Sequence, residues 1–468
     1  MQTSFTVERL DADPHLAQAD KILKSCQHYG FCTSGCPTYV LLHDELDSPR
    51  GRIDLIKEML EDGGPPKAST VKHLDRCLSC MSCMTTCAVQ VDYQHLVDTA
   101  RVHIEKTYRR PWLDRVIRTT LSTVMPRPRL FVAAIHLGSW VRPFAKWLPT
   151  PVASLLEFVP AKLPAASLST DTLFPALGEK RKRVALLAGC VQPVLQPSIN
   201  AATIRLLTRF GCEVVIPQGA GCCGSLTLHM GQLDTAKASA RRNIDAWLTE
   251  LDGQGLDAII TNASGCGSTV KDYAELFLDE PLFAAEAARV AAISKDISEF
   301  LAELDLPVSD CLNGLHVAYH DACSLRNVQK VTKPPRALLR DAGFEVEDVP
   351  EGHFCCGSAG TYNLLQPEIA KQLGERKAMN IASTRHDVVA AGNIGCMTQL
   401  TGYLATPIVH TVELLDWAHG GPKPRGLGGI ELARLPRAAK PSSSVIPILA
   451  ASEAPSTSAG SENDVGIW

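Results

Sequence analysis

The sequence predicts a multidomain α+β protein in which an α-helical, cysteine-rich N-terminal part precedes two copies of an α/β unit. Three observations lead to this fold class. Seven of the 17 cysteines lie within the first 105 residues, the later half of the chain contains an internal repeat, and each copy alternates short apolar strands with longer helical stretches. At 468 residues the chain is too long for one ordinary domain of about 100–200 residues.

The composition restricts the class of protein. A net charge of −4 argues against a general nucleic-acid binder, so we expect no nucleic-acid partner. The first residues carry acids and lack the apolar segment of a signal peptide, and no apolar run approaches the ~20 residues of a membrane span. We therefore expect a cytoplasmic protein, with peripheral attachment to the inner face of the cell membrane as a further option. Clustered thiols in a reducing compartment usually bind metal.

Changes in composition divide the chain into five predicted parts. They are a cysteine-rich N-terminal domain, a basic helical connector, the two repeat units and a disordered tail rich in Pro, Ala, Ser and Gly, with predicted bounds 1–105, 106–182, 183–310, 311–420 and 421–468. Within 106–150 the connector holds nine Lys or Arg residues, one acid and three tryptophans. This pattern fits a membrane-facing surface and, equally, a helical arm packed on the N-terminal domain with its cations in water.

Local signals place a helix between the two groups of N-terminal cysteines. Ser48 is a suitable N-cap residue, Pro49 suits the first helical position, and Gly63 with Gly64 ends the helix. We therefore expect helices to carry the turns that hold the cysteines.

Cys77-x2-Cys80-x2-Cys83-x3-Cys87 has the spacing of bacterial ferredoxins. There the first three cysteines bind one cubane iron–sulfur cluster and the fourth reaches the neighbouring cluster. Zinc would prefer four ligands in an isolated tetrahedron, commonly as paired Cys-x2-Cys turns. Three successive cysteines at this spacing fit a cubane cluster better, so the motif predicts a two-cluster ferredoxin module.

An incomplete copy of the motif comes earlier in the chain. Its spacing and its Cys-Pro ending match, but Tyr29 stands at the second ligand position. In a two-cluster ferredoxin, the last cysteine of each motif binds the cluster of the other motif. Two sites are therefore predicted: site one with Cys26, Cys32 and Cys87, and site two with Cys36, Cys77, Cys80 and Cys83. We expect a [4Fe–4S] cluster at site two. At site one we expect a [3Fe–4S] cluster, or a [4Fe–4S] cluster whose open corner takes water, with Tyr29 packed over it. The alternative is that site one is empty.

Matched cysteines carry the internal repeat. Cys190, Cys222 and Cys266 recur as Cys323, Cys355 and Cys396, at offsets of 133, 133 and 130 residues. In each copy the middle cysteine begins a Cys-Cys-Gly sequence, whose glycine lets the backbone approach sulfur closely. We predict two metal or cluster sites, here named CCG centres: the first with Cys190, Cys222, Cys223 and Cys266, the second with Cys323, Cys355, Cys356 and Cys396. The alternative is that these thiols only pack as small hydrophobes.

Three further residues have no counterpart in the other copy. We interpret Cys212 and Cys311 as structural cysteines. His320, beside Asp321, is assigned a core or hydrogen-bonding role rather than a role as a metal ligand.

In combination these motifs resemble a known family. The Cys-x31-Cys-Cys-Gly arrangement is similar to the cysteine-rich CCG domains of heterodisulfide reductases. A paired ferredoxin, a linker and two CCG domains resemble the iron–sulfur subunits of glycolate oxidases, and so do GFCTSGCPTY, SPRGRIDLIKEML, CCGSAGTYNLLQPE and HTVELLDWA. The resemblance covers about residues 20–420. The chain departs from the family pattern in two ways. Tyr29 stands where a cysteine is expected, and the final cysteine of the longer CCG pattern is absent after Cys266 and Cys396.

The resemblance implies a function as well as a fold. FAD-containing hydroxy-acid oxidase subunits would oxidise glycolate or D-lactate, and this chain would pass the electrons towards the quinone pool or another membrane acceptor. The chain would be an oxidoreductase subunit that does not act on the hydroxy acid by itself, which agrees with the absence of a Gly-rich dinucleotide motif. Two other functions stay open: a thiol–disulfide reductase that uses the CCG centres, and a zinc-stabilised scaffold.

Overall fold

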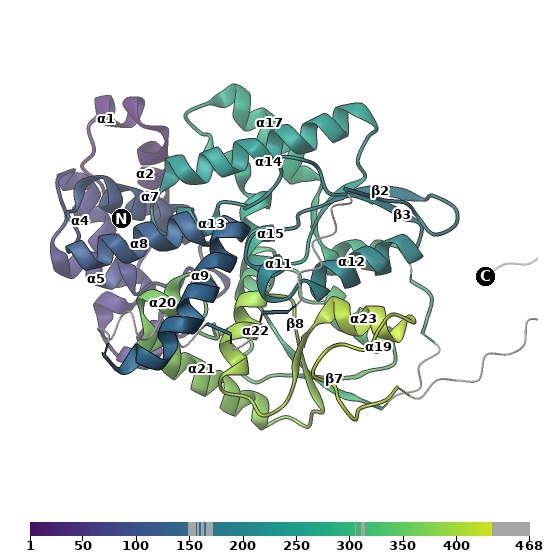
Figure 1. Cartoon of the computed structure of the whole chain (residues 1–468). Helices are drawn as coiled ribbons and strands as arrows, with labels where there is room; N and C mark the ends of the chain where they lie inside the picture. The colour runs from purple at the N-terminus through teal and green to yellow at the C-terminus, as the bar shows by residue number, and fades with distance from the viewer. Residues whose placement is uncertain are drawn as a thin grey trace, which may run out of the picture. The chain divides into compact units, whose positions relative to one another are not determined.

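The computed structural model (Figure 1) describes residues 1–147, 156, 159–160, 163–164, 172–304, 306–309 and 314–432. These residues belong to one compact unit. Cys311 and residues 433–468 of the predicted tail lie outside the described residues, as does the predicted boundary between positions 310 and 311.

The N-terminal module consists of helices, as the sequence predicts. They are α1 (Val7–Ala12), α2 (Pro14–Ser25), η1 (Phe31–Thr33), α3 (Pro37–Leu42), η2 (Glu45–Asp47), α4 (Pro49–Asp62), α5 (Ala68–Asp75), α6 (Ser82–Thr85) and α7 (Tyr93–Thr107). Their apolar faces meet in one core that includes Leu23, Ile56, Leu74 and Leu96. The same core contains several cysteines of the two motifs, so the thiols are held by packed helices.

Helix α4 begins and ends as predicted. The Ser48 side chain accepts a hydrogen bond from the Gly51 N–H, Pro49 takes the first helical position, and Gly63 ends the helix in the left-handed conformation at φ 72°. An N–H at the first helical position would have no partner within the helix, so proline, which has no N–H, suits this position. Glycine avoids the steric cost that a side chain would have at positive φ. The predicted helix and its caps are confirmed.

The connector continues as α8 (Trp112–Val124), α9 (Pro128–Val141) and η3 (Arg142–Trp147). Two cations near its start are buried against the N-terminal module, where Arg110 and Arg118 both pair with Asp75. The connector is therefore anchored to that module at its start. Residues Leu173–Phe174, within the predicted connector range, form strand β1, which pairs with the first repeat.

Each repeat folds as a parallel sheet flanked by helices. The first contains β2 (Lys182–Leu186), α11 (Gln192–Leu195), α12 (Ser198–Arg209), β3 (Cys212–Val215), α13 (Ser225–His229), α14 (Leu233–Gly253), β4 (Ala258–Thr261), α15 (Ser264–Lys271), α16 (Tyr273–Leu276), α17 (Pro281–Ala292), β5 (Ser294–Asp296) and α18 (Ile297–Glu303). The second contains β6 (His316–His320), η4 (Ser324–Val328), α19 (Pro334–Asp341), β7 (Glu345–Asp348), α20 (Tyr362–Leu365), α21 (Pro367–Ala382), β8 (Val388–Ala391), α22 (Ile394–Thr401), β9 (Ile408–His410) and α23 (Thr411–Ala418).

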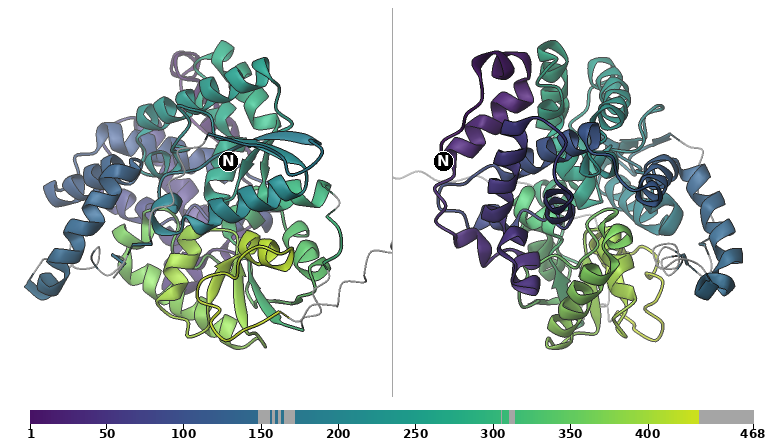
Figure 2. Two further views of the ribbon diagram at one scale, coloured as in Figure 1. Left: turned by 45° about the vertical axis from the view of Figure 1, so that its right-hand side comes forward. Right: turned by 90° about the vertical axis from the view of Figure 1, so that its left-hand side faces the viewer.

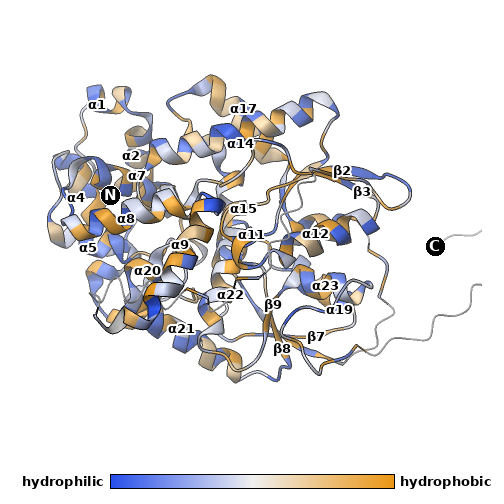
Figure 3. Cartoon of the chain, in the orientation of Figure 1, coloured by the Kyte–Doolittle hydropathy of each residue, from blue (hydrophilic) through white to orange (hydrophobic). Residues whose placement is uncertain are grey.

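The two sheets share one topology. Strand order is β1-β3-β2-β4-β5 in the first sheet and β7-β6-β8-β9 in the second, and all pairs are parallel except β1 with β3. Matching registers place Val184 opposite Val214 and Val317 opposite Val346. The central strands β4 and β8 are buried along their whole length and almost continuously apolar, as expected where a sheet is covered on both faces, and Figure 3 shows this for β8. The predicted α/β repeat is confirmed.

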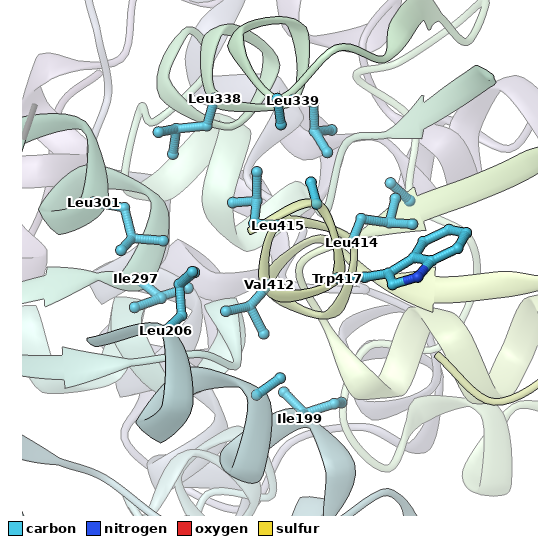
Figure 4. Close-up of a cluster of buried hydrophobic side chains, with 14 of the residues drawn as sticks. Ile199, Leu206, Ile297, Leu301, Leu338, Leu339, Val412, Leu414, Leu415 and Trp417 are labelled. Carbon is cyan, nitrogen blue, oxygen red and sulfur yellow. The ribbon is translucent and has the colours of Figure 1, made fainter. Parts of the chain in front are cut away.

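A single hydrophobic core joins the two repeats (Figure 4). On one side it contains Ile199 and Leu206 of α12 with Ile297 and Leu301 of α18. On the other side it contains residues of α19 and α23, namely Leu338, Leu339, Val412, Leu414, Leu415 and Trp417. On the face that is turned away from this shared core, each sheet has a separate second core. Two further views of the helices around the sheets are given in Figure 2.

The hydropathy of the described helices was tested against the thickness of a bilayer. Among them, none is both long enough and apolar enough to cross a membrane.

Candidate metal centres

Site two is formed by a tight loop and two flanking segments. Cys77 and Cys80 lie in the loop before α6, Cys83 lies in α6, and Cys36 precedes α3. All four side chains are buried. Ser79 and Met81 adopt φ values of 51° and 53°, which curl the loop so that its thiols face inward. Burial, followed by the neighbouring thiols of Cys80, Cys36 and Cys77, raises the pKa of Cys83 well above its usual value.

Polar groups are already directed at the sulfurs of site two. The buried Arg52 donates from Nη1 to Cys36 Sγ at 3.8 Å and from Nη2 to Asp47 at 3.2 Å. The Tyr93 hydroxyl donates to Cys77 Sγ at 3.7 Å. An iron–sulfur cluster with four thiolates is anionic, so a buried cation and a hydrogen-bond donor are what it requires from its surroundings. The four thiols and these donors fit a [4Fe–4S] cluster.

Site one has three thiols and no fourth. Burial, followed by the nearby Cys87 and Cys26, raises the pKa of Cys32 to about 11. The Val91 N–H donates to Cys87 Sγ at 3.4 Å. Tyr29 lines the same small cavity, of about 40 Å³, but its side chain is 63% exposed. The structure thus brings the three predicted cysteines together and leaves Tyr29 at the rim.

The first CCG centre lies at the carboxyl ends of the strands of the first sheet. Cys190 follows β2, Cys222 and Cys223 follow β3, and Cys266 lies in the first turn of α15 after β4. Strand ends of this kind are the usual ligand-binding edge of a parallel sheet. Hydrogen bonds from the thiols of Cys190 and Cys223, with the Gly224 N–H at 3.5 Å, lower the pKa of Cys222 to about 3. The centre therefore favours a thiolate at Cys222.

The second CCG centre repeats this arrangement. Cys323 follows β6, Cys355 and Cys356 follow β7, and Cys396 lies in α22 after β8. The Sγ atoms of Cys323 and Cys355 are 3.9 Å apart, and the Gly357 N–H donates to Cys355 Sγ at 3.4 Å. Hydrogen bonds from the Cys323 and Cys356 thiols lower the pKa of Cys355 well below its usual value.

The glycine of each Cys-Cys-Gly sequence is required by its surroundings. Gly224 and Gly357 have φ values of 87° and 90°. A Cβ atom on either residue would lie 3.0 Å or less from a backbone oxygen, that of Ala236 in the first copy and Ala370 in the second. Only glycine combines the left-handed backbone with this close approach, and it thereby directs its N–H at the cysteine sulfur.

The two CCG centres face one cavity. Its volume is about 370 Å³, and its lining includes Cys190, Cys222, Cys223, Cys266, Cys323, Cys355 and Cys396. Leu78 and Met81 from the loop of site two reach the cavity, as do Leu121 of α8 and Ile135 of α9. Hydrogen bonds also tie the cysteine-bearing segments together, since the Asn393 amide donates to Ser264, whose hydroxyl meets that of Ser324 at 2.8 Å.

Site two adjoins the second CCG centre. Cys80 and Cys355 belong to one buried cluster with Leu78 and Tyr362, and Cys323 packs against it. Burial, followed by the nearby Cys355 thiol, raises the pKa of Cys80 well above its usual value. Two hydrogen bonds fix the contact: the Asn327 amide donates to the Cys80 carbonyl at 2.8 Å, and the Tyr362 hydroxyl donates to the Arg76 carbonyl at 2.9 Å.

Some residues at these sites differ from expectation or were missed. Cys212 is buried in the shared core, as expected of a structural cysteine. His320 is also buried, as its predicted core role requires, but among the described residues neither ring nitrogen has the hydrogen-bond partner of the alternative role. Burial, followed by the charge of Lys377, lowers the pKa of His320 to about 3. Sequence reasoning missed Arg52, Tyr93 and Lys377, which lie far along the chain from the thiols they approach.

Comparison with known proteins agrees with this architecture. The family model described as "4Fe-4S dicluster domain" matches residues 25–92, and the one described as "Cysteine-rich domain" matches residues 184–271 and 317–401. The "Glycolate oxidase iron-sulfur subunit" of Escherichia coli (strain K12) is 41% identical over 418 residues, which cover 89% of this chain and 99% of that protein. The chain belongs to the family of glycolate oxidase iron–sulfur subunits. The predicted family and fold class are confirmed.

Other relatives in and near this family extend the comparison. The "Probable glycolate oxidase iron-sulfur subunit" of Bacillus subtilis (strain 168) is 33% identical over 398 residues, covering 81% of this chain and 88% of that protein. "Lactate utilization protein A" of Bacillus licheniformis is 28% identical over 242 residues, which cover 50% of this chain and 99% of that protein. This shorter relative therefore matches about half of the present chain.

Proposed function

We propose that this chain is the iron–sulfur electron-transfer subunit of a complex that oxidises glycolate or D-lactate. In this proposal a FAD-containing flavoprotein subunit oxidises the hydroxy acid and delivers electrons to the chain, which passes them towards quinone. The names of the relatives support the substrate class. The observation that carries the proposal is the contact between Cys80 of site two and Cys355 of the second CCG centre.

Through that contact, the four cysteine sites form a continuous series in which each site adjoins the next. Site one adjoins site two, because the Cys32 thiol is among the groups that act on Cys83. Site two adjoins the second CCG centre through Cys80 and Cys355. The two CCG centres face each other across their shared cavity. Because electron transfer weakens steeply with distance, adjacent buried centres are the arrangement that an electron-transfer subunit needs.

We propose a [4Fe–4S] cluster at site two, held by Cys36, Cys77, Cys80 and Cys83. Such a cluster supplies a one-electron carrier. At site one, Cys26, Cys32 and Cys87 would hold a [3Fe–4S] cluster or a [4Fe–4S] cluster with water at its open corner. The CCG centres would hold further iron or another thiophilic metal. The predicted domain bounds stay part of this proposal with two corrections: β1 joins the first repeat at Leu173, and the predicted tail starts too early, since Leu427 is buried in the shared core.

We further propose that α8, α9 and η3 meet the membrane surface. Their exposed apolar side chains include Trp112, Leu137, Trp140 and Trp147. Between positions 106 and 147, the cations whose exposure the structure describes include six exposed ones, namely Lys106, Arg109, Arg115, Arg127, Arg129 and Arg142. Cations attract anionic lipid headgroups, and tryptophan favours the membrane interface. The opposite faces of α8 and α9 line the CCG cavity, so the same helices would bring the centres close to a membrane-bound acceptor.

A thiol–disulfide reductase is the second candidate function. Two observations favour it: the low pKa of Cys222, and the cavity that exposes the CCG thiols. Low thiol pKa values and access are features of redox-active cysteines. Disulfide reduction by the purified chain without a flavoprotein would support this function, whereas electron uptake only from a copurified flavoprotein supports the electron-transfer subunit.

The decisive test is Cys80→Ser in the chain assembled with its flavoprotein partner under anaerobic conditions. We expect loss of the EPR signal of site two and at least a tenfold loss of quinone reduction, while the hydroxy acid still reduces the flavin. Cys212→Ser is the matched control, because Cys212 is equally buried but lies outside the four sites. Quinone reduction that survives Cys80→Ser at the rate of the control would contradict the proposed path.

A further inference from the structure

The two CCG centres differ at one position that the repeat makes directly comparable. The offset of 133 residues pairs His320, at the end of β6, with Leu187, directly after β2. Both side chains are buried, at 1% and 3% exposure. Leucine packs in the second core of the first repeat. The same place beside the second sheet holds an imidazole instead.

Packing alone does not account for this histidine. Among the described residues neither Nδ1 nor Nε2 has a hydrogen-bond partner. Leaving a buried polar group without a partner costs about 1–3 kcal/mol, and the first repeat shows that leucine fills the equivalent space without that cost. A buried imidazole with free nitrogens therefore needs a partner that the protein chain itself does not provide.

The nearest candidate ligand atoms identify that partner. A ring nitrogen of His320 and the Sγ atoms of Cys356 and Cys396 all lie within 4.8 Å of one another. Lys377 is buried nearby and is held by the Glu351 carbonyl at 2.7 Å. A buried ring nitrogen beside two buried thiols is the ligand arrangement that a thiophilic metal takes.

We propose that His320 is a metal ligand. One ring nitrogen binds, together with the thiolates of Cys356 and Cys396, the iron or zinc of the second CCG centre. This centre then has a mixed nitrogen and sulfur ligand set, whereas the first has thiolates alone. The proposal concerns metal binding and holds whether or not the chain passes electrons towards quinone.

Mixed ligation has a consequence for redox chemistry if the metal is iron. A neutral imidazole in place of an anionic thiolate leaves the centre less negative, and such ligation raises the reduction potential of iron–sulfur centres. Lys377 acts in the same direction. Its counterpart is Asn243, because Ala236 and Ala370 occupy equivalent places 134 residues apart, and Asn243 carries no charge. The second centre would then accept electrons more readily than the first.

The test uses the full-length chain, purified anaerobically and labelled with ¹⁵N-histidine. Metal analysis first identifies iron or zinc. For iron, pulsed EPR on the reduced protein should show the strong coupling of a directly bound histidine nitrogen. For zinc, X-ray absorption at the zinc edge should show a nitrogen in the first shell. His320→Leu, which copies the first repeat, should abolish the nitrogen signal and lower the metal content by about one centre per chain.

Two more variants separate ligation from a structural role. His320→Cys offers a thiolate and should restore the metal content without the nitrogen signal. Leu187→His places an imidazole beside the first centre and should leave the signal of the second unchanged in the wild-type His320 background. A wild-type chain without bound histidine nitrogen, or a His320→Leu chain with unchanged metal content and signal, would overturn the proposal.

Discussion

The Tyr93 hydroxyl and the Arg52 guanidinium are the groups that set the electrostatic environment of site two. Tyr93 donates to the sulfur of Cys77, and Arg52 to that of Cys36. Both come from helices that neighbour the cysteine loop, α7 and α4. Reduction adds negative charge to an iron–sulfur cluster, so donors and cations at its sulfurs favour the reduced state.

Tyr93→Phe should therefore lower the reduction potential of site two. A hydrogen bond worth about 0.5–1.5 kcal/mol corresponds to roughly 20–65 mV for one electron. An EPR-monitored redox titration of the full-length chain measures the change. Tyr362→Phe is a matched control, because Tyr362 is also buried near site two but donates to the Arg76 carbonyl instead of a sulfur. Equal shifts in the two variants would show that the hydrogen bond to Cys77 is not the cause.

Tyr29→Cys should complete the ligand set of site one. In the wild type we expect a three-iron EPR signal in the oxidised protein, because the exposed phenol stands where a fourth thiolate is needed. In the variant the signal should convert to that of a reduced four-iron cluster. Absence of any cluster at site one in both proteins would contradict this prediction.

At the scale of elements, the parts that sequence could predict are those specified locally. Helix α4 was predictable because its caps are Ser48 and Gly63 themselves. The repeat strands were predictable because buried parallel strands are continuous apolar runs. Strand β1 was not, since two residues become a strand only by pairing with β3. The closeness of His320 to Cys356 and Cys396 could not be predicted for a similar reason, because the three residues meet only once the second sheet has formed.

The connector shows how structure refines a prediction from charge. Arg110 and Arg118 form buried ion pairs with Asp75, so the segment packs on the N-terminal module, but with two cations buried instead of in water. Trp140 and Trp147 are 81% and 89% exposed, as the membrane interpretation requires of its anchors. The two interpretations therefore concern different faces of the connector, and the membrane interpretation predicts that the exposed face binds lipid.

Flotation with anionic vesicles should show binding of the full complex at low salt and less binding at high salt. Trp140→Ser combined with Trp147→Ser should weaken binding severalfold, because it removes two interfacial anchors. Leu282→Ser is the matched control, since Leu282 of α17 is 91% exposed but lies outside the connector. Absence of binding at both salt concentrations would rule out the membrane surface, and equal loss in the control would show a nonspecific effect.

At the scale of the whole molecule, the repeats and the N-terminal module are held together by polar contacts as well as by packing. The two repeats share one apolar core. The N-terminal module is joined to the first repeat through His95 of α7, whose ring contacts Asp92 at 2.5 Å and Asp272 at 3.0 Å. Gln94 donates to the same Asp272 carboxylate at 2.8 Å. One ionised histidine between two carboxylates therefore links the two parts.

The charge on His95 predicts how stability changes with pH. Burial opposes the protonated ring, but hydrogen bonds from it to Asp272 and Asp92 prevail and raise the pKa of His95 to about 11. The unfolded chain has a histidine pKa near 6.5. Because the folded value is the higher one, the stabilisation is complete below pH 6.5 and is lost progressively as pH rises towards 11. The loss is at most about 1.4 kcal/mol per pH unit and is reduced by solvent screening, since the side chain is 19% exposed.

His95→Gln should remove this dependence, because glutamine can still donate a hydrogen bond but carries no proton that titrates. The thermal midpoints are compared from pH 6.5 upwards, the range in which the stabilisation by His95 changes. Near pH 6.5 the wild type should be the more stable protein, and the two midpoints should draw together as pH rises towards 11. The difference between the proteins is the readout, because cysteines titrating in the same range affect both alike. Midpoints that stay a constant distance apart across the range would show that His95 is not charged in the folded chain.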